Sequence, residues 1–334
     1  MRKLLLTSSA LVAAASISSY AVADVSVTGG FEWKYNSQSA DHATKDGDSF
    51  ATDNEIVISF SNKTDSGLTV GGKMEMGNYG NNGANQTAII DESVLTVSGG
   101  FGTFRLGAED PIDESFGIDE QDLIDEEGNG LFTSASLGNT SNLGMGGDGN
   151  KIAYLTPSIN GFQAGYSLED SGATGTTDTS AMGLSYSMPL GGGSMVFKYN
   201  QATKDGTNDT DTTNMGVQFT TGALTAIIST GSKEILNDEN IEGNGAAIRY
   251  DMGGGMTVGV ASVEVTDDTD VSAGEEESYS ATIGEVVYTV APGLKAKVTY
   301  TDYEYKNGGE VGGSSFGGSD DAGQITTITM TAAF

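Results

Sequence analysis

The chain lacks cysteine, and among its 334 residues it has one histidine and four prolines. Without cysteine, neither a disulfide nor a thiolate metal site can form. Because His42 is the single histidine, Ser-His-Asp and Cys-His catalysis would have to use it, and multi-histidine metal sites are excluded. No paired-carboxylate motif stands out among the many acidic residues, so we expect a protein that is not an enzyme and has no resident cofactor.

Basic residues are scarce as well. The 46 aspartates and glutamates outnumber 15 lysines and arginines, which gives a net charge of −31. Such a polyanion repels the phosphates of nucleic acid, so nucleic-acid partners are excluded. Its surface attracts cations instead, and both cation selectivity and a saline habitat are consistent with this acidity.

A long apolar run occurs only at the N-terminus. Arg2 and Lys3 precede an apolar stretch over residues 4–15, and residues 21–23 (Ala-Val-Ala) provide the small-x-small pattern of a signal-peptidase site. We therefore predict that residues 1–23 are a signal peptide that is cleaved on export. No later segment approaches the roughly 18 consecutive apolar residues of a spanning helix, so the mature chain could cross a membrane only as a closed barrel.

What the sequence does contain is a period-two alternation of apolar and polar residues that recurs throughout residues 24–334. At the C-terminus, Ile328, Met330 and Phe334 are separated by threonines and alanines, and their even spacing places them on one face of a strand. The alternation predicts sixteen strands in a single domain. Their expected ranges are 25–35, 54–61, 68–76, 89–97, 102–107, 150–155, 162–168, 179–188, 194–199, 213–219, 223–229, 243–250, 256–265, 277–289, 294–305 and 324–334.

The links between these strands alternate in length. Seven are short and built from turn residues such as glycine, asparagine and proline. The long ones cover residues 36–53, 77–88, 108–149, 169–178, 200–212, 230–242, 266–276 and 306–323, and they hold most of the acidic residues. Short turns at one end and long loops at the other are typical of an all-β transmembrane antiparallel up-and-down β-barrel with periplasmic turns and extracellular loops.

The two faces of the predicted strands differ as a barrel in a membrane requires. Aromatic and aliphatic residues share one parity, and the aromatic ones gather near strand ends, as expected for girdles at the membrane interfaces. Expected outward residues include Phe31, Trp33, Tyr35, Phe60, Tyr154, Phe162, Tyr166, Tyr186, Phe197, Phe219, Tyr250 and Tyr300. The opposite parity holds serine, threonine, glycine, glutamine and charged residues, which predicts a water-filled polar interior.

Four segments in this order resemble the Gram-negative general porins of the alphaproteobacterial type: residues 24–31, residues 102–107, residues 150–162 and the terminal Phe334. The resemblance covers the whole of residues 24–334. It implies a sixteen-stranded barrel in the outer membrane, surrounded by lipid and assembled as a homotrimer, whose third loop folds into the pore. It also implies that the terminal aromatic residue belongs to the signal read by the outer-membrane insertion machinery.

The third long link, residues 108–149, is the longest and corresponds to the constriction loop that the resemblance implies. Ser115, Phe116 and Gly117 are similar to the Pro-Glu-Phe-Gly element of some porin third loops, although the proline is absent. An acidic loop inside a pore creates a negative field, which low-dielectric walls focus. The candidate constriction acids are Glu109, Asp110, Asp113, Glu114, Asp119 and Glu120.

Basic residues of inward parity are the expected counterpart of this loop. Lysine or arginine facing lipid at mid-depth costs about 2–4 kcal/mol, so parity should place them in the lumen. Those near the closing seam of the barrel are Lys34, Lys73, Arg105, Lys295 and Lys297. Facing the acidic loop, they would form a basic wall and a transverse field that orients polar solutes. Alternatively, they balance neighbouring acids such as Glu32 and Glu75.

These features favour a passive diffusion channel for small hydrophilic solutes and ions that prefers cations. One alternative is a surface adhesin or structural β-protein whose acidic loops do the work. Another is a substrate-specific channel, which would need a run of lumen aromatics, whereas most aromatics here have outward parity. The acidic segments 46–48 and 267–270 could bind Ca²⁺ weakly, although neither follows the EF-hand spacing.

Overall fold

The computed structural model describes residues 24–41, 47–81, 89–124, 140–144, 147, 149–169, 178–206, 209–236, 240–267, 277–306 and 320–334. The predicted signal peptide, residues 1–23, lies outside these ranges, as do Asp46, Asp268 and Asp270 of the two acidic segments. Within the described ranges, no helix is long and apolar enough to cross a bilayer.

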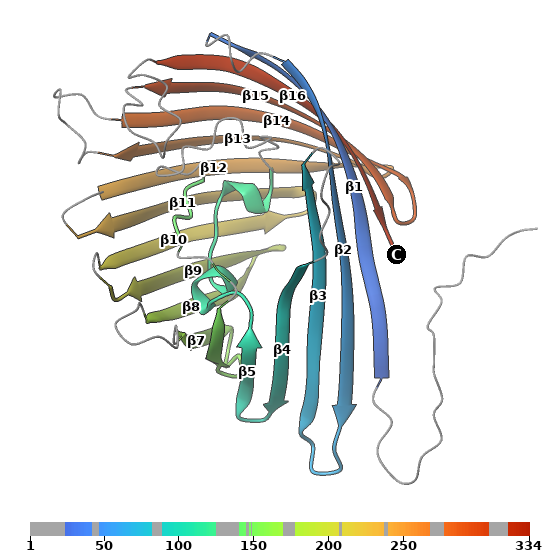
Figure 1. Cartoon of the computed structure of the whole chain (residues 1–334), viewed down its shortest axis with the longest axis vertical. Helices are drawn as coiled ribbons and strands as arrows, with labels where there is room; N and C mark the ends of the chain where they lie inside the picture. The colour runs from blue at the N-terminus through green and yellow to red at the C-terminus, as the bar shows by residue number, and fades with distance from the viewer. Residues whose placement is uncertain are drawn as a thin grey trace, which may run out of the picture.

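The strands form one closed antiparallel barrel (Figure 1). Each strand pairs with its neighbours in the sequence, and β1 pairs with β16 to close the ring. The sixteen strands of the described residues are β1 Asp24–Ala40, β2 Gly47–Lys63, β3 Thr69–Asn81, β4 Ile89–Gly99, β5 Gly102–Ala108, β6 Asn150–Leu155, β7 Phe162–Glu169, β8 Thr179–Leu190, β9 Gly193–Lys204, β10 Thr210–Thr221, β11 Leu224–Ile235, β12 Asn240–Gly253, β13 Met256–Asp267, β14 Glu277–Ala291, β15 Leu294–Lys306 and β16 Asp321–Ala333. The predicted all-β barrel of sixteen strands is confirmed.

All sixteen strands lie where the alternation predicted them, but many extend further into the long links. β1 ends at Ala40 and β2 begins at Gly47, whereas the predicted link covered residues 36–53. In this part of β1 both faces are polar: Asn36 and Gln38 are buried on the inner face, and Ser37 and Ser39 alternate with them. A search for apolar/polar alternation cannot detect a strand whose two faces are both polar.

The seven links from an even strand to the next odd strand are all described, and all are short. The link between β8 and β9 consists of Gly191 and Gly192, with φ angles of 43° and 99°. A two-residue hairpin turn of this kind needs positive φ at both positions, which glycine adopts without steric cost. Such tight links fix the register of each hairpin, so that Leu190 pairs directly with Gly193.

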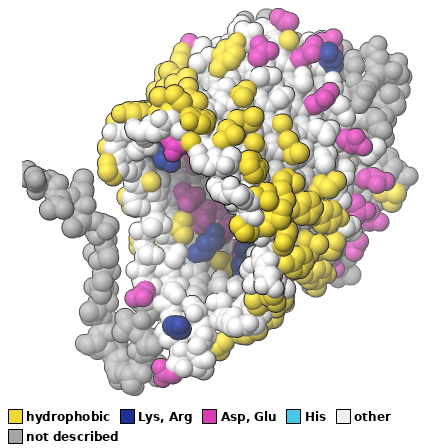
Figure 2. All heavy atoms as spheres, turned by 180° about the vertical axis from the view of Figure 1, so that it is seen from behind, with side chains coloured by type: hydrophobic (Ala, Val, Ile, Leu, Met, Phe, Trp, Pro, Cys, Tyr) yellow, Lys and Arg dark blue, Asp and Glu magenta, His cyan; other side chains and the backbone are white. Residues whose placement is uncertain are grey.

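The outer face of the barrel is apolar, as predicted. Phe31, Phe60, Phe162, Tyr186 and Tyr300 are among the large apolar side chains that are exposed on it. Apolar side chains also form patches on the surface that Figure 2 shows. A lipid-facing barrel needs such a surface, because hydrocarbon solvates apolar groups and excludes charged ones.

The C-terminal residue takes part in closing the barrel. The backbone N–H of Phe334 donates to the carbonyl of Gly29 (3.0 Å), and its carbonyl accepts from the Gly29 N–H (3.2 Å). Along β16, Ile328 is exposed on the outer face while Thr327 and Thr329 are buried on the inner one. The alternation at the end of the chain therefore belongs to the strand that seals the ring against β1.

The interior is not uniformly polar, and the prediction of a polar inner face was wrong for parts of β11 to β16. The inner faces of these strands carry buried apolar side chains, and the third long link packs its own apolar side chains against those of β11 to β13. Members of this cluster are Ile227, Ile241, Val263, Val265, Tyr279, Ile283, Tyr303 and Ile325 from the strands, and Ile118, Leu123 and Ile124 from the link. Parity identifies the inner face of a strand, but it does not show that a loop covers that face.

Candidate functional site

The third long link, residues 108–149, is here named loop 3, and its described residues lie inside the barrel (Figure 1). It contains a helical turn, α1 (Ile112–Ser115), and a 3₁₀ turn, η1 (Glu120–Asp122). α1 packs against the inner faces of β7, β8 and β9, and η1 packs against β11, β12 and β13. The described part of loop 3 therefore covers the wall from β7 to β13, and its predicted inward fold is confirmed.

Two asparagines on the barrel wall bind the backbone of loop 3. Asn200 of β9 donates to the carbonyl of Asp113 (3.0 Å). Asn214 of β10 accepts from the Ile118 N–H (2.9 Å) and donates to the Ile118 carbonyl (3.1 Å). Both asparagines are buried. Their amides supply the hydrogen bonds that a partner strand would otherwise provide, and a buried peptide group without such a partner is costly.

Two inward-facing cations serve the same purpose. Lys198 of β9 donates to the carbonyl of Gly117 (2.8 Å), and Arg249 of β12 donates to the carbonyl of Leu123 (3.3 Å). The inward parity of these residues is visible in the sequence. Their role as anchors of loop 3 depends on the path of the loop, which the sequence does not give.

Glu120 joins the two arms of loop 3 to each other. It is fully buried, and its carboxylate accepts hydrogen bonds from the Ser141 hydroxyl (2.7 Å) and the Ser141 N–H (3.2 Å). The Ser141 hydroxyl also lies 2.7 Å from the hydroxyl of Ser229 on β11. Burial raises the pKa of Glu120, and the hydrogen bond from Ser141 opposes this shift. Glu120 therefore belongs to the contact between loop and wall.

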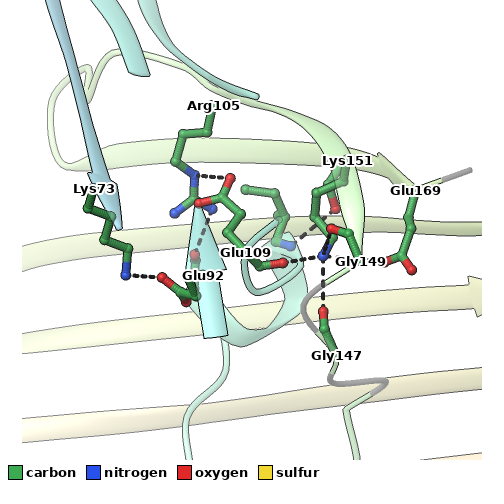
Figure 3. A network of polar contacts seen from close by, with 11 residues as sticks. Lys73, Glu92, Arg105, Glu109, Gly147, Gly149, Lys151 and Glu169 are labelled. Carbon is green, nitrogen blue, oxygen red and sulfur yellow. Dashed lines mark hydrogen bonds and ion pairs between the residues drawn. The ribbon is translucent and has the colours of Figure 1, made fainter. Parts of the chain in front are cut away.

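Lys151, the second residue of β6, holds the two ends of loop 3 together (Figure 3). Its ammonium group donates to the carbonyls of Glu109, Gly147 (3.0 Å) and Gly149 (2.9 Å), and it lies 3.3 Å from the carboxylate of Glu169. The side chain is 0 % exposed. Lysine has three N–H donors, so all of them are used by carbonyls at the two roots of one loop.

Arg105 of β5 also contacts the start of loop 3 (Figure 3). Its Nε lies 3.1 Å from the carboxylate of Glu109, and its Nη2 donates to the hydroxyl of Ser115 (3.2 Å). Glu109 is buried, which raises the pKa of its carboxyl, while the Arg105 charge lowers it. Arg105 and Glu109 thus stabilise the root of loop 3 as an ion pair.

The wall formed by β1 to β4 carries two further basic residues, Lys34 and Lys73, in ion pairs. Lys34 lies 2.8 Å from the carboxylate of Glu32. Lys73 lies 3.2 Å from the carboxylate of Glu75 and also pairs with Glu92 on β4, as Figure 3 shows for Glu92. The side chains of Lys34 and Lys73 remain 29 % and 37 % exposed. Both lysines therefore have carboxylate neighbours, which is the arrangement considered above as the alternative to a free basic wall.

The register shows which members of the expected basic wall lie together. Lys34 and Lys297 flank Thr329 in one row across β1, β16 and β15. Lys295 lies one row further along the inner face of β15, opposite Thr331. Lys73 and Arg105 are on β3 and β5, on the other side of β1 and β2. The five basic residues therefore form two groups, one at the closing seam and one at the root of loop 3.

The six candidate acids of loop 3 divide into two kinds. Glu109, Asp113 and Glu120 are buried against the wall, whereas Asp110 and Glu114 are exposed and Asp119 is half-buried. Enclosure within the barrel, followed by the charges of Asp113, Asp110 and Asp119, raises the pKa of Glu114 to about 7. Burial also raises the pKa of Asp119, whose carboxylate accepts a hydrogen bond from Thr140 (2.7 Å). Only part of the predicted acidic loop can face a permeating solute.

Acidic and basic side chains meet in a hollow of the molecule, which Figure 2 shows between lighter, uncharged surfaces. The same residues do not build a metal centre. Among the described residues, no group of three or more aspartates, glutamates or histidines could hold a metal ion. In the Ca²⁺ segments proposed from sequence, Asp48 lies in β2 and Asp267 is buried at the end of β13, and the other acids are outside the described ranges.

The sequence of this chain matches a known protein family. The family profile described as Gram-negative porin matches residues 7–308. The chain belongs to the Gram-negative porin family. As a porin it is a channel of the outer membrane and spans that membrane with β-strands, in agreement with the barrel and its apolar outer face.

Several solved structures share the fold of this porin. An anion-selective porin from Comamonas acidovorans is 15% identical, with a TM-score of 0.68, and the match covers 94% of this chain and 100% of that one. The trimer form of OmpT, an outer membrane protein of Vibrio cholerae, is 12% identical with a TM-score of 0.66 and coverage of 93% and 99%. Salmonella typhi OmpF in complex with daunomycin is 12% identical, with a TM-score of 0.68 and coverage of 93% and 97%. A search of curated proteins found no significant match.

The residues that hold loop 3 in this porin are ones that sequence reasoning did not single out as a site. They include Lys151, Asn200 and Asn214, all buried on the inner face. One signal for them exists in the sequence: asparagine is depleted in strands, so an inward asparagine in the middle of β9 or β10 calls for a hydrogen-bond partner. The identity of that partner follows only from the fold.

Proposed function

We propose that this porin is a passive diffusion channel for small hydrophilic solutes and ions, and that it prefers cations. The observation that carries the preference is the distribution of charge on the open part of the lumen. On the wall of β1 to β4, Lys73 lies between two glutamates, Glu75 and Glu92. Lys34 is paired with Glu32, and Asp53 lies directly opposite Glu32 on the neighbouring strand. This wall therefore has more carboxylates than ammonium groups.

Loop 3 adds charge of the same sign. Asp110 and Glu114 are exposed, while the arginine and lysines near the loop are engaged in its docking. A unit charge attracts a counter-ion 4 Å away by about 1 kcal/mol in water, and by more where a narrow low-dielectric channel focuses the field. A cation passing through the lumen then meets negative potential on both sides, and an anion is repelled.

The aromatic residues weigh against a substrate-specific channel. Among the described residues, Tyr279, Tyr303 and Tyr305 face inward, but all three are buried. Tyr303 donates to the carboxylate of Asp321 (3.3 Å), and Tyr305 donates to that of Glu277. Buried side chains with such partners do not form an exposed aromatic path along which a sugar could slide.

The remaining parts of the proposal concern maturation and assembly. Residues 1–23 are removed on export, residues 24–334 form the barrel, and the insertion machinery of the outer membrane reads the terminal Phe334. Three copies then assemble as a homotrimer. Trimeric assembly is supported by the likeness to OmpT of Vibrio cholerae, a protein of the same fold that has a trimer form. The proposal involves no catalysis and no cofactor.

The test is electrical recording of purified mature protein in a planar lipid bilayer under a salt gradient. We expect discrete open-channel steps and a reversal potential of the sign that indicates cation preference. Absence of steps would contradict the channel function, and a reversal potential of the opposite sign would contradict the charge argument alone. On a detergent gel, a difference in migration between unboiled and boiled protein checks that the barrel is folded.

A further inference from the structure

Seven glycines of the described strands lie on the inner face of the barrel directly beneath loop 3. A glycine inside a strand weakens the strand, and it often marks a place where another segment approaches closely. These glycines, here named the glycine track, are Gly165 on β7, Gly183 on β8, Gly216 on β10, Gly231 on β11, Gly243 and Gly245 on β12, and Gly259 on β13. They span the same strands, β7 to β13, that α1 and η1 contact.

The first part of the track receives Phe116, the residue that follows α1. A β-carbon on Gly165 would lie 2.6 Å from the Phe116 ring and 3.0 Å from the side chain of Ile112. A β-carbon on Gly183 would overlap the same ring. Phe116 and Ile112 are buried here together with alanines of β6, β8 and β9. The ring therefore occupies space that exists only because two adjacent strands carry glycine.

The rest of the track receives the later parts of loop 3. A β-carbon on Gly216 would lie 2.8 Å from the side chain of Ile118, and one on Gly259 would overlap Ile124. On β12, β-carbons at Gly243 and Gly245 would lie 2.9 Å from Cα and 2.8 Å from the hydroxyl oxygen of Ser141. Both arms of the loop, before and after residues 125–139, thus rest on glycines.

Polar groups lie between the glycines and fix the loop along the track. β9 has no glycine in the track, and it is β9 that supplies Asn200 and Lys198 as donors to loop carbonyls. β10 supplies Asn214 beside Gly216. The wall therefore alternates places where the loop can approach closely with places where its backbone is bound.

From this geometry we propose that the glycines of the track are positioning residues for permeation. They let loop 3 lie flat against β7 to β13, and so they set how far the loop projects toward the charged wall of β1 to β4 and how wide the remaining opening is. The inference rests on the proposed channel function and adds the residues that determine its cross-section. Loop 3 therefore lies in the space that the glycines of the track leave on the inner wall.

The test compares Gly183→Ala with Gly30→Ala by single-channel recording. Gly30 is an inward glycine of β1 whose β-carbon would have no neighbour closer than 3.8 Å, so it is a matched control. The methyl carbon extends about 1.5 Å from the backbone, and in Gly183→Ala it must push Phe116 and the loop into the lumen. We expect a lower conductance for Gly183→Ala and an unchanged conductance for Gly30→Ala. An unchanged or higher conductance for Gly183→Ala would overturn the proposal.

A second substitution separates the seating of the loop from a general weakening of the strand. When Phe116→Gly removes both the ring and the β-carbon of residue 116, the atoms that the added methyl of Gly183→Ala would overlap are gone, so the two substitutions should be strongly non-additive in conductance. Additive effects would argue against the proposal. If Gly183→Ala does not yield a folded barrel on unboiled gels, Gly165→Ala with Phe116→Ala provides the comparison, because the nearest atoms to a β-carbon on Gly165 are side-chain atoms of loop 3. The wild-type recording tests the channel function separately, because the inference concerns only differences from wild type.

Discussion

The inner wall of this porin has two parts that differ although the strand pattern is the same in both. From β7 to β13 the inner face combines glycine, alanine, aliphatic residues and buried amides with Lys198 and Arg249, which bind the loop backbone, and the described part of loop 3 covers it. From β1 to β5 the inner face carries ion pairs such as Lys34–Glu32 and Lys73–Glu75, which remain partly exposed. One part is a dry docking surface and the other lines the lumen. Alternation along a strand shows which side chains face the interior of the barrel. Whether they are buried or line the lumen depends on whether loop 3 covers them.

The two parts also differ in what holds them. Ile112, Ile118 and Ile124 of loop 3 are at most 2% exposed, and full burial of such a side chain contributes about 1.5–3 kcal/mol. A partly exposed ion pair contributes about 0–1 kcal/mol. The loop side is therefore held by packing and buried hydrogen bonds, whereas the charged wall contributes little to stability and can be changed with little effect on the fold.

The largest effect should come from releasing the roots of loop 3 with Lys151→Met. The substitution keeps most of the length of the side chain but removes the donor to three carbonyls and the partner of Glu169. A buried carbonyl that loses its hydrogen-bond donor costs about 1–3 kcal/mol, which we expect to appear as weaker docking of the loop while the barrel stays closed. Single-channel recordings should then show higher conductance and more noise than wild type.

Lys306→Met is the matched control for that prediction. Lys306 ends β15 and pairs with Glu304 at 2.9 Å, but both side chains are about half exposed. Water replaces such a pair easily, so conductance and noise should stay at the wild-type level. If Lys151→Met folds, as shown by unboiled gels, but has the same conductance and noise as wild type, the role assigned to Lys151 is contradicted.

Much of the fold could be predicted from the sequence because it depends on local rules. Period-two alternation and turn residues predict the sixteen strands and the long third link, whereas its entry into the pore was implied by the resemblance to the porins. The strand ends escaped detection where both faces are polar, as around Asn36 and Gln38. Those ends are held by pairing with β2 and β16, which a search along one strand cannot register.

The candidate site was harder to predict because burial in the interior depends on the path of loop 3. Glu114 and Glu120 are both acids of this loop, yet one is exposed and the other is hydrogen-bonded to Ser141 in a buried contact. Lys34 and Lys198 both have inward parity. Lys34 is partly exposed and pairs with Glu32, whereas Lys198 binds the carbonyl of Gly117 in loop 3. Sequence gives the side of the strand, and only the three-dimensional path gives the partner.

A smaller effect, on selectivity, should distinguish the exposed acid from the buried one. With Glu114→Gln, measured well above pH 7, we expect the ratio of cation to anion permeability to fall about fourfold, because a charge about 10 Å away in water attracts a cation and repels an anion by about 0.4 kcal/mol each. With Glu120→Gln the ratio should stay unchanged, because that carboxylate is fully buried and bound to Ser141. Reversal potentials in a salt gradient measure both, and an equal fall in the two variants would remove the distinction between lining and docking acids.

The smallest effect should be a pH dependence of the same selectivity. Because enclosure and neighbouring acids raise the pKa of Glu114 from 4.5 to about 7, its carboxyl is neutral below about pH 7 and charged above it. The permeability ratio of wild type should therefore fall as the pH is lowered through about 7, and the Glu114→Gln variant should lack this step. The same shift makes the charged form unfavourable in the folded protein, so docking of loop 3 should weaken slightly as the pH rises from about 4.5 to about 7. If Glu114→Gln keeps the wild-type step, another group titrates in the lumen, and the exposed face of loop 3 does not control the preference for cations.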